Sequence, residues 1–399
     1  MKILGIETSC DETAAAVVED GVRILSNVVV SQIDIFAEYG GVIPEVAARS
    51  HLEAMMPVVN KALSDAGCTW EDIDAIAVTH APGLLGSLLI GTLTARTLAI
   101  LHDRPLYAVH HLKSHVYANW LNSTKETKPV FSSAGLEFSS TSYAGSRAEP
   151  PLRGEPVRPV RNIGVENSNQ NFMLQKRQVL VSQTPQFPLI ALVISGGHTQ
   201  ILYMPAHNQF EIIGTTRDDA VGECFDKVAK ILGLPYPGGP SIAKSALGGD
   251  AEKYKLPHPK IEGLDFSFSG LKTAVLRTVQ KELGLPISHP SHDLKNHLSK
   301  KQVADFAASF QKTTVEILCE KLALALEQHP DVQSVVIAGG VSANKALREA
   351  LPEAYFPVPS LSGDNGAMVA AAAYYEIISG VEPTDPYSLN IYPRISIEK

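Results

Sequence analysis

Residues 2–29 have the sequence KILGIETSCDETAAAVVEDGVRILSNVV, which predicts a three-stranded meander. Runs rich in β-branched and other apolar residues flank a polar turn at residues 7–13. Asp20-Gly21 then forms a hairpin turn into a third run. The expected strands are residues 2–6, 14–19 and 22–29.

The same order of elements recurs from residue 189 onward. A Gly-rich polar turn at residues 195–199 replaces the first polar turn, and His207-Asn208 replaces the Asp-Gly hairpin. The expected strands here are residues 189–194, 200–204 and 210–214. A helix is expected after each meander, at residues 45–66 and 219–232. We interpret the repeat as a duplicated α/β unit, although two unrelated meanders would give the same order.

The first of these helices has an apolar pattern with the helical period. Pro57 lies inside it and predicts a kink or a restart there, because proline cannot donate the backbone hydrogen bond. The expected buried face consists of Leu52, Met55, Met56, Val59 and Leu63.

The chain has 399 residues, a formal net charge of −8 and four cysteines. No apolar run reaches the roughly 18 residues that a membrane span needs, and the N-terminal segment has no signal-peptide pattern. The cysteines do not form a CxxC pair, so neither a zinc knuckle nor a disulfide scaffold is expected. These features predict a reduced, cytoplasmic protein. The acidic total does not indicate nucleic-acid binding, nor does it exclude a local basic stripe.

A polar segment of 66 residues, 122–187, separates the two meanders. It is rich in Ser, Pro, Gly, Asn and Gln, has no sustained periodicity, and carries eight Lys or Arg against five Glu. We predict a disordered or loosely ordered surface insertion. The expected domains are a first lobe at residues 1–121, completed by about 335–399, and a second lobe at residues 188–334.

His111 and His115, within His110-His-Leu-Lys-Ser-His115, would face the same side of a helix and offer two metal ligands. Leu112 stands where a zinc protease of the HExxH type has its catalytic glutamate, which disfavours that class. Asp364, before an Ala-rich helix at residues 367–375, would complete a two-His-one-carboxylate set suited to Fe²⁺ or another divalent ion. Ordinary histidines and a helix cap are the alternatives.

Two glycine-containing stretches predict contact between backbone and a nucleotide. Ser195-Gly-Gly-His-Thr199 occupies the same place in its meander as the first polar turn, and paired turns of this kind could bind phosphate oxygens. Gly339-Gly340 follows a buried strand and would let an adenine or ribose approach the backbone. Asp226 could accept a hydrogen bond from a ribose. Plain hairpins, tight packing and a surface ion pair would explain the same residues.

Residues 271–302 carry six basic side chains against two acidic ones. His289, His292 and His297 lie among them. The segment is a candidate for contact with a phosphate backbone, and a solvated basic face is the alternative. The basic residues are Lys272, Arg277, Lys281, Lys295, Lys300 and Lys301.

Taken together, the motifs resemble the tRNA threonylcarbamoyladenosine transferase family, the bacterial TsaD proteins, within the actin-like ATPase superfamily. They follow the family order and cover nearly all of the chain outside the insertion. The stretches that carry the resemblance are GIETSCDET, YGGVIPEVAARSH, APGLLGSLLIG, HHLKSH, VISGGHTQ, GECFDKVAKILGLPYPGGP, GLDFSFSGLKT, AGGVSANKALR and GDNGAMVA.

The resemblance implies a duplicated actin-like fold with two lobes around a nucleotide cleft. It also implies transfer of a threonylcarbamoyl group from threonylcarbamoyl-AMP to N6 of adenosine 37, in tRNAs that read ANN codons, with release of AMP. Implied partners are tRNA, a paralogous actin-like protein and a small ATPase, with no membrane. The implied cofactor is one divalent metal, with Fe²⁺ expected and Zn²⁺ or Mg²⁺ as alternatives.

By motif match, His111, His115 and Asp364 would hold the metal, and Asp11 could orient the incoming adenine amine. The residues that would bind the adenylate are Val193, Ile194, Ser195, Gly196, Gly197, Asp226, Gly239 and Asn344.

Two features depart from the family pattern. Lys113-Ser114 stands where members usually have an acidic residue and a small one, and the insertion looks foreign to ordinary members. Neither departure removes a ligand position. An actin-like kinase or ATPase and a non-catalytic nucleotide-binding scaffold are the competing functions, and neither needs the two histidines and Asp364.

Overall fold

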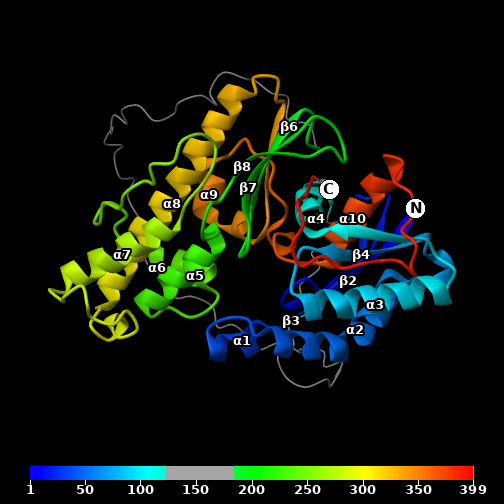
Figure 1. Ribbon diagram of the computed structural model, residues 1–399, viewed down its shortest axis with the longest axis horizontal. Coiled ribbons are helices and arrows are strands. Elements are labelled where there is room, and N and C mark those ends of the chain that lie inside the picture. Colours follow the sequence, from blue (N-terminus) through cyan, green and yellow to red (C-terminus); the bar gives the residue numbers. More distant parts are fainter. Residues whose placement is uncertain (123–183, 399) are drawn as a thin grey trace, which may run out of the picture. The chain divides into compact units, whose positions relative to one another are not determined.

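The computed structural model describes residues 1–122 and 184–398, and two β-sheets lie at its centre (Figure 1). The strands are β1 (Lys2–Glu7), β2 (Glu12–Glu19), β3 (Arg23–Ser31), β4 (Ala75–Ala81), β5 (Leu106–His110), β6 (Leu189–Ile194), β7 (Thr199–Met204), β8 (Glu211–Thr215) and β9 (Ser334–Ala338). The first sheet has the order β3-β2-β1-β4-β5 and the second the order β8-β7-β6-β9.

The two sheets repeat one topology. In each, three consecutive strands form an antiparallel meander, and the first strand of that meander then pairs in parallel with a later strand. Even the irregularities match, because the register shifts between β2 and β3 and again between β7 and β8. Both expected meanders and the duplicated α/β fold of the actin-like type are therefore confirmed.

Helices cover both faces of the sheets, which explains why strands such as β1 and β6 are nearly continuous apolar runs. The helices are α1 (Ile33–Tyr39), α2 (Pro44–Ala66), α3 (Leu85–Leu101), α4 (His111–Tyr117), α5 (Val221–Leu232), α6 (Gly238–Ala246), α7 (Ser269–Glu282), α8 (Lys300–Gln328), α9 (Lys345–Ala350) and α10 (Gly366–Ile378). Short 3₁₀ turns are η1 (Trp70–Asp72), η2 (Ala118–Trp120), η3 (Leu294–Asn296), η4 (Gly340–Ala343) and η5 (Pro359–Leu361).

Helices α4 and α10 connect the two sheets. α4 contacts β4 and β5 of the first sheet and β6 and β9 of the second, while α10 packs on β1 and β2. α10 comes this close because two glycines meet: a Cβ on Gly5 would lie 2.2 Å from the carbonyl oxygen of Gly366. One buried cluster consequently runs from Ile3 of the first sheet through the alanines of α10 to Leu189 of the second.

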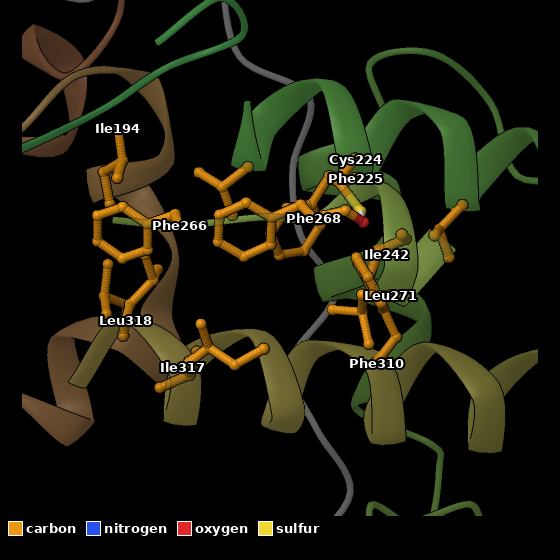
Figure 2. Packing of buried hydrophobic residues seen from close by; sticks show 14 of the residues in the cluster. Ile194, Cys224, Phe225, Ile242, Phe266, Phe268, Leu271, Phe310, Ile317 and Leu318 are labelled. Atoms are coloured by element: carbon orange, nitrogen blue, oxygen red, sulfur yellow. Dashed lines mark hydrogen bonds between the residues drawn. The ribbon is translucent and has the colours of Figure 1, made fainter. Parts of the chain in front are cut away.

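Two further clusters lie on the other faces. α2 and α3 bury one against the first sheet. The second sheet packs against α5 and α8, where Figure 2 shows Phe225, Phe268 and Phe310 directed toward one another. Phe225 and Phe310 meet edge to face with ring centroids 5.0 Å apart. The first of the three clusters contains the buried side chains of both α4 and α10, and this packing holds the residues on these two helices in place.

The first long helix differs from its prediction in two ways. α2 continues through Pro57 from Pro44 to Ala66, so the helix does not restart there. Met55, Val59 and Leu63 are buried as expected, but Leu52 and Met56 are 68% and 42% exposed. Ala47, His51, Ala54, Val58 and Ala62 contribute to the buried face instead. Small residues allow α2 to approach the sheet, and the large apolar residues at 52 and 56 are left on its outer side.

The expected lobe boundary near residue 335 lies one element too early. β9 pairs in parallel with β6 and so belongs to the second sheet, whereas α10 returns to the first. The helices between β8 and β9 form the crossover that a parallel pair requires.

The predicted insertion at residues 122–187 lies outside the described residues except for its ends. There the Asn122 amide donates to the Val22 carbonyl, and Phe187 stacks on Trp120. Among the described residues, no helix is long and apolar enough to cross a membrane.

Candidate active site

β5 delivers the two histidines to the start of α4. His110 ends the strand and caps the helix, because its ring nitrogen Nδ1 accepts a hydrogen bond from the Leu112 amide at 3.2 Å. His111 and His115 follow one turn apart, with ring centroids separated by 4.6 Å. Both are buried, at 7% and 1% exposed. The helix expected at this motif is present, and the i, i+4 spacing places both imidazoles on one side.

Asp364 reaches the histidines from the turn before α10. Asn365 begins that helix by accepting the Met368 amide at 3.0 Å, which holds the turn in place. Asp364 Oδ1 lies 3.1 Å from His115 Nε2 and 3.6 Å from His111 Nε2. Burial raises the pKa of Asp364, but the charges of His111 and His115 outweigh burial and bring it down to about 2. A carboxylate therefore faces two imidazole nitrogens.

The three side chains fit a divalent metal. One ligand atom from each lies within 4.8 Å of the others. Among the residues that the structure describes, neither ring nitrogen of the buried His115 has a hydrogen-bond partner, so its 3.1 Å approach to Asp364 does not have the geometry of a hydrogen bond. A buried polar atom without a partner costs about 1–3 kcal/mol, and a metal ion in this position would remove that cost. Two imidazoles with one carboxylate suit Fe²⁺ or Zn²⁺.

Glu7, at the end of β1, orients His111, and the sequence analysis did not identify it. Its Oε2 lies 3.1 Å from His111 Nδ1 and accepts the Thr79 hydroxyl at 2.6 Å. A carboxylate only accepts, so Nδ1 of His111 carries the proton and Nε2 is left for a metal. Burial lowers the pKa of His111, but Asp364 and Glu7 together raise it to about 9. In the sequence, the signal for this role was an acidic residue at the end of an apolar strand.

Asp11 lies in the same β1–β2 turn and is 9% exposed. Burial is the main reason that its pKa is raised; hydrogen bonds to Glu12 and Cys10 oppose the rise, and the charge of Asp364 adds to it. Burial and Asp11 also raise the pKa of Glu12 well above its usual range. The Asp11 and Glu12 side chains therefore form an acidic pair near Asp364, and each carboxylate accepts a proton more readily than an exposed one would.

The matching turn of the second sheet, residues 195–199, approaches from the other side. Burial and the charges of His111 and His115 together lower the pKa of His198 to about 4, so the turn lies near the histidine pair. Glycine allows its close packing: at Gly339, with φ of +86°, a Cβ would lie 2.5 Å from the Ile194 carbonyl oxygen. Gly222 likewise donates to the Ser195 carbonyl at 3.2 Å.

The residues expected to bind the adenylate fall into two groups. Val193 and Ile194 direct their side chains into the cores, so only their backbone is available to a ligand. Gly196, Gly197 and Gly239 have open space where a Cβ would stand. A phosphate or a ribose in that space could approach the backbone amides directly.

Asp226 and Asn344 already have protein partners. Asp226 Oδ1 accepts the Gly238 amide at 2.6 Å. The pKa of Asp226 is raised to about 6, mainly by burial and in part by the charge of Asp11, while the Gly238 hydrogen bond opposes the rise. Asp11 of the β1–β2 turn and Asp226 of α5 therefore lie close enough for their charges to interact. Asn344 caps α9 through the Leu347 amide at 3.2 Å and donates to Gln311 at 3.0 Å.

The departure at Lys113 does not disturb the histidine pair. Its ammonium group lies 4.0 Å from Glu376 of α10 and 5.4 Å from the ring centroid of Phe210. Burial raises the pKa of Glu376 to about 7, and Lys113 opposes that rise. The basic side chain thus has a carboxylate partner away from Asp364.

Fold and site together define an actin-like α/β protein. Its candidate metal site consists of two histidines and a carboxylate and lies beside the matching turns of the two sheets. A family model described as TsaD: tRNA N6-adenosine threonylcarbamoyltransferase matches residues 23–135 and 170–371. The tRNA N6-adenosine threonylcarbamoyltransferase of Symbiobacterium thermophilum is 43% identical over 404 residues, covering 99% of this chain and 96% of that protein. The protein of the same description from Caldicellulosiruptor saccharolyticus is 40% identical, covering 100% and 98%. This chain belongs to the tRNA N6-adenosine threonylcarbamoyltransferase family and is an acyltransferase that modifies tRNA.

Solved structures with similarity include the activator of the 2-hydroxyisocaproyl-CoA dehydratase from Clostridium difficile with bound ADPNP. It is 12% identical, with a TM-score of 0.45 over 95% of this chain and 96% of that one. The ROK hexokinase from Thermus thermophilus is 15% identical, with a TM-score of 0.38 over 94% and 98%. YeaZ from Pseudomonas aeruginosa is 26% identical, with a TM-score of 0.22 over 29% and 46%.

Proposed function

We propose that the protein transfers the threonylcarbamoyl group of threonylcarbamoyl-AMP to N6 of adenosine 37, in tRNAs that read ANN codons, and releases AMP. The observation that carries this proposal is the buried His111–His115–Asp364 group, in which His115 has no hydrogen-bond partner within residues 1–122 and 184–398. An actin-like kinase or a nucleotide-binding scaffold has no need for such a group. Its place beside two matching turns is suited to an adenylate whose reactive carbonyl points toward the histidines.

His111, His115 and Asp364 would hold one divalent metal, for which we propose Fe²⁺, with Zn²⁺ or Mg²⁺ as alternatives. When bound, such an ion polarises a carbonyl or phosphate oxygen and stabilises developing negative charge. Glu7 keeps the proton on Nδ1 of His111. The protein thereby holds Nε2 and a carboxylate at fixed positions, and a bound metal would displace the proton from Nε2.

The adenylate would be bound by the second sheet and its crossover. Backbone amides of residues 193–197 and the open position at Gly239 would face its phosphate and ribose. Asp226, which already accepts the Gly238 amide, would accept a ribose hydroxyl with its other oxygen. Asn344 would contribute from its position at the start of α9.

We propose that Asp11 orients the adenine amine and accepts its proton. The N6 lone pair forms a bond to the carbamoyl carbonyl carbon, and the bond from that carbon to the phosphate oxygen breaks. AMP leaves with the electron pair of the broken bond, and the N6 proton goes to the Asp11 carboxylate. Burial raises the pKa of Asp11, which makes this carboxylate a better proton acceptor than an exposed one.

The test combines purified protein, threonylcarbamoyl-AMP, unmodified tRNA and the expected partner proteins, followed by mass spectrometry of the digested nucleosides. We expect threonylcarbamoyladenosine together with tRNA-dependent release of AMP. If neither forms while a known family member is active with the same components, the proposed reaction is wrong. Phosphorylation of a small molecule at the expense of ATP would support the kinase alternative.

Asp226→Asn should raise the KM for threonylcarbamoyl-AMP by about tenfold, since a hydrogen bond to a charged group contributes about 1.5–3 kcal/mol, and leave kcat nearly unchanged. The pKa of Asp226 is about 6. The charged form accepts both donors, so wild-type affinity should be complete above that pH and decrease below it. KM should be measured from about pH 5 to about pH 8, which extends at least about one pH unit on either side of that pKa. The variant should lack the pH dependence. Equal KM values for both proteins would contradict the assignment.

We further propose that the partner is a paralogous actin-like protein, with a small ATPase as a third component, and that they work in the cytoplasm. Support comes from apolar side chains left on the outer side of α2 and α3, which pack side by side (Figure 1). Exposed apolar rows of this kind mark protein interfaces. They comprise Leu52 and Met56 of α2 and Leu85, Leu89 and Leu93 of α3.

Leu89→Glu should prevent co-elution with that paralogous partner in size-exclusion chromatography, because a charge would be buried in the apolar interface. The expected loss of affinity is at least about 100-fold. Leu247→Glu is the matched control, since Leu247 is 83% exposed directly after the end of α6, in the other lobe. Unchanged co-elution of Leu89→Glu would place the interface elsewhere.

A further inference from the structure

A second group of metal-ligating side chains lies in the connection between α7 and α8. His289 Nε2 and His297 Nε2 approach the same oxygen, Oδ2 of Asp293, at 2.9 and 3.0 Å. The two rings are nearly perpendicular, with centroids 5.5 Å apart. Among residues 1–122 and 184–398, this group and His111–His115–Asp364 are the two in which three such side chains converge within 4.8 Å.

The connection is held in place by groups outside the cluster. Asn296 donates to the other oxygen of Asp293 at 2.8 Å and so orients the carboxylate. Leu294, one residue further along from Asp293, is fully buried in the core. Gln280 of α7 is also buried, and its amide donates to the carbonyls of Ile287 and His289 at 3.1 and 3.0 Å. The three proposed ligands therefore lie in a loop whose conformation these contacts hold in place.

The geometry points to a site for a divalent ion of the zinc class: we propose that His289, Asp293 and His297 bind Zn²⁺ through Nε2, a carboxylate oxygen and Nε2, with water completing the coordination. Zinc takes imidazole nitrogens at about 2.0–2.1 Å and carboxylate oxygens at about 2.0–2.2 Å. A tetrahedron of those radii separates its ligand atoms by about 3.3 Å. The distances of 2.9 and 3.0 Å from the two nitrogens to Asp293 Oδ2 differ from that separation by a few tenths of an ångström.

Imidazole and carboxylate ligands suit zinc, copper or nickel better than magnesium, because a magnesium ion prefers six oxygens. The hydrogen bond from Asn296 to Oδ1 leaves Oδ2 directed at the histidines. An aspartate side chain is charged at neutral pH, as a ligand must be.

A bound ion would close the loop from residue 289 to residue 297 and join its two ends. Because the site exists only in the folded chain, the ion would stabilise the fold in proportion to its concentration relative to Kd. Nothing in the tRNA reaction requires it, so we assign it a structural role in the α7–α8 connection.

The test counts zinc bound to the full-length protein by equilibrium dialysis and elemental analysis, using Zn²⁺ alone as the probe. We expect His289→Ala/His297→Ala to bind one zinc ion fewer per chain than the wild type, with affinity at the lost site reduced more than about 100-fold. His292→Ala is the matched control, because His292 is exposed in the same loop but outside the cluster. It should bind as many ions as the wild type. Equal zinc content in the double variant and the wild type would overturn the proposal.

A second measurement separates this site from the proposed catalytic one. In a His111→Ala/His115→Ala background, added Zn²⁺ should raise Tm, and adding His289→Ala/His297→Ala to that background should abolish the rise. Asp293→Asn in the same background should reduce it while keeping the loop's shape. If Zn²⁺ raises Tm equally with and without His289 and His297, the loop is not a zinc site. This outcome does not depend on whether the protein transfers threonylcarbamoyl groups.

Discussion

His111→Ala/His115→Ala should lower the rate of threonylcarbamoyl transfer by at least about 10³-fold, because a metal ion contributes several kcal/mol of transition-state charge stabilisation. The variant should also lose one bound metal ion per chain. Asp364 would remain as an incompletely neutralised carboxylate, with its side chain only 17% exposed, so a modest fall in stability is expected as well.

The rate is measured by nucleoside mass spectrometry, the metal content by elemental analysis, and the fold by circular dichroism and thermal unfolding. His289→Ala/His297→Ala is the matched control for the rate: it removes the other histidine pair that lies around a carboxylate and should leave the transfer rate unchanged. A double variant at positions 111 and 115 that retains full activity without bound metal would refute the assignment. His111→Asn/His115→Asn, which leaves smaller cavities, tests the same point if the alanine variant unfolds.

Glu7→Gln should reduce metal affinity by about 10- to 100-fold, the usual cost of losing a carboxylate that orients a metal-binding histidine. The carboxylate contributes to raising the pKa of His111 to about 9, and an uncharged amide would not do so. His111 would then be a less basic ligand with less fixed tautomer. Transfer at limiting metal concentration should decline by the same factor as the affinity.

Glu7 is a positioning residue in this account, so excess metal should restore most of the transfer rate in Glu7→Gln. Metal titration with rate and KM measured at each concentration provides the readout. Glu12→Gln is the matched control, because Glu12 lies in the same turn but accepts from Ser31, not from His111. Unchanged metal affinity in Glu7→Gln would show that the contact with His111 has no functional role. A rate loss that saturating metal does not reverse would also contradict a purely positioning role.

Strand prediction succeeded where local patterns and burial agree. The polar turns at residues 7–13 and 195–199 stand between apolar runs, and both meanders formed as expected. The face of α2 was predicted less well, since apolar Leu52 and Met56 are exposed while alanines are buried. Helical periodicity specifies which residues share a side, but the depth at which a helix packs depends on the size of its small residues. From a single sequence, apolar side chains that remain exposed on a helix cannot be distinguished from those that are buried in the core.

Local sequence determined the duplicated meanders, the helix carrying His111 and His115, and the helix start directly after Asp364, because each depends on neighbours a few residues away. Only the tertiary structure decided that Asp364 lies 3.1 Å from His115, that Glu7 contacts His111, and that β9 joins the second sheet. These contacts span about a hundred residues or more of sequence. They arise when α4 and α10 pack between two sheets through the Gly5–Gly366 approach. Packing over such separations is cooperative, and no local pattern encodes it.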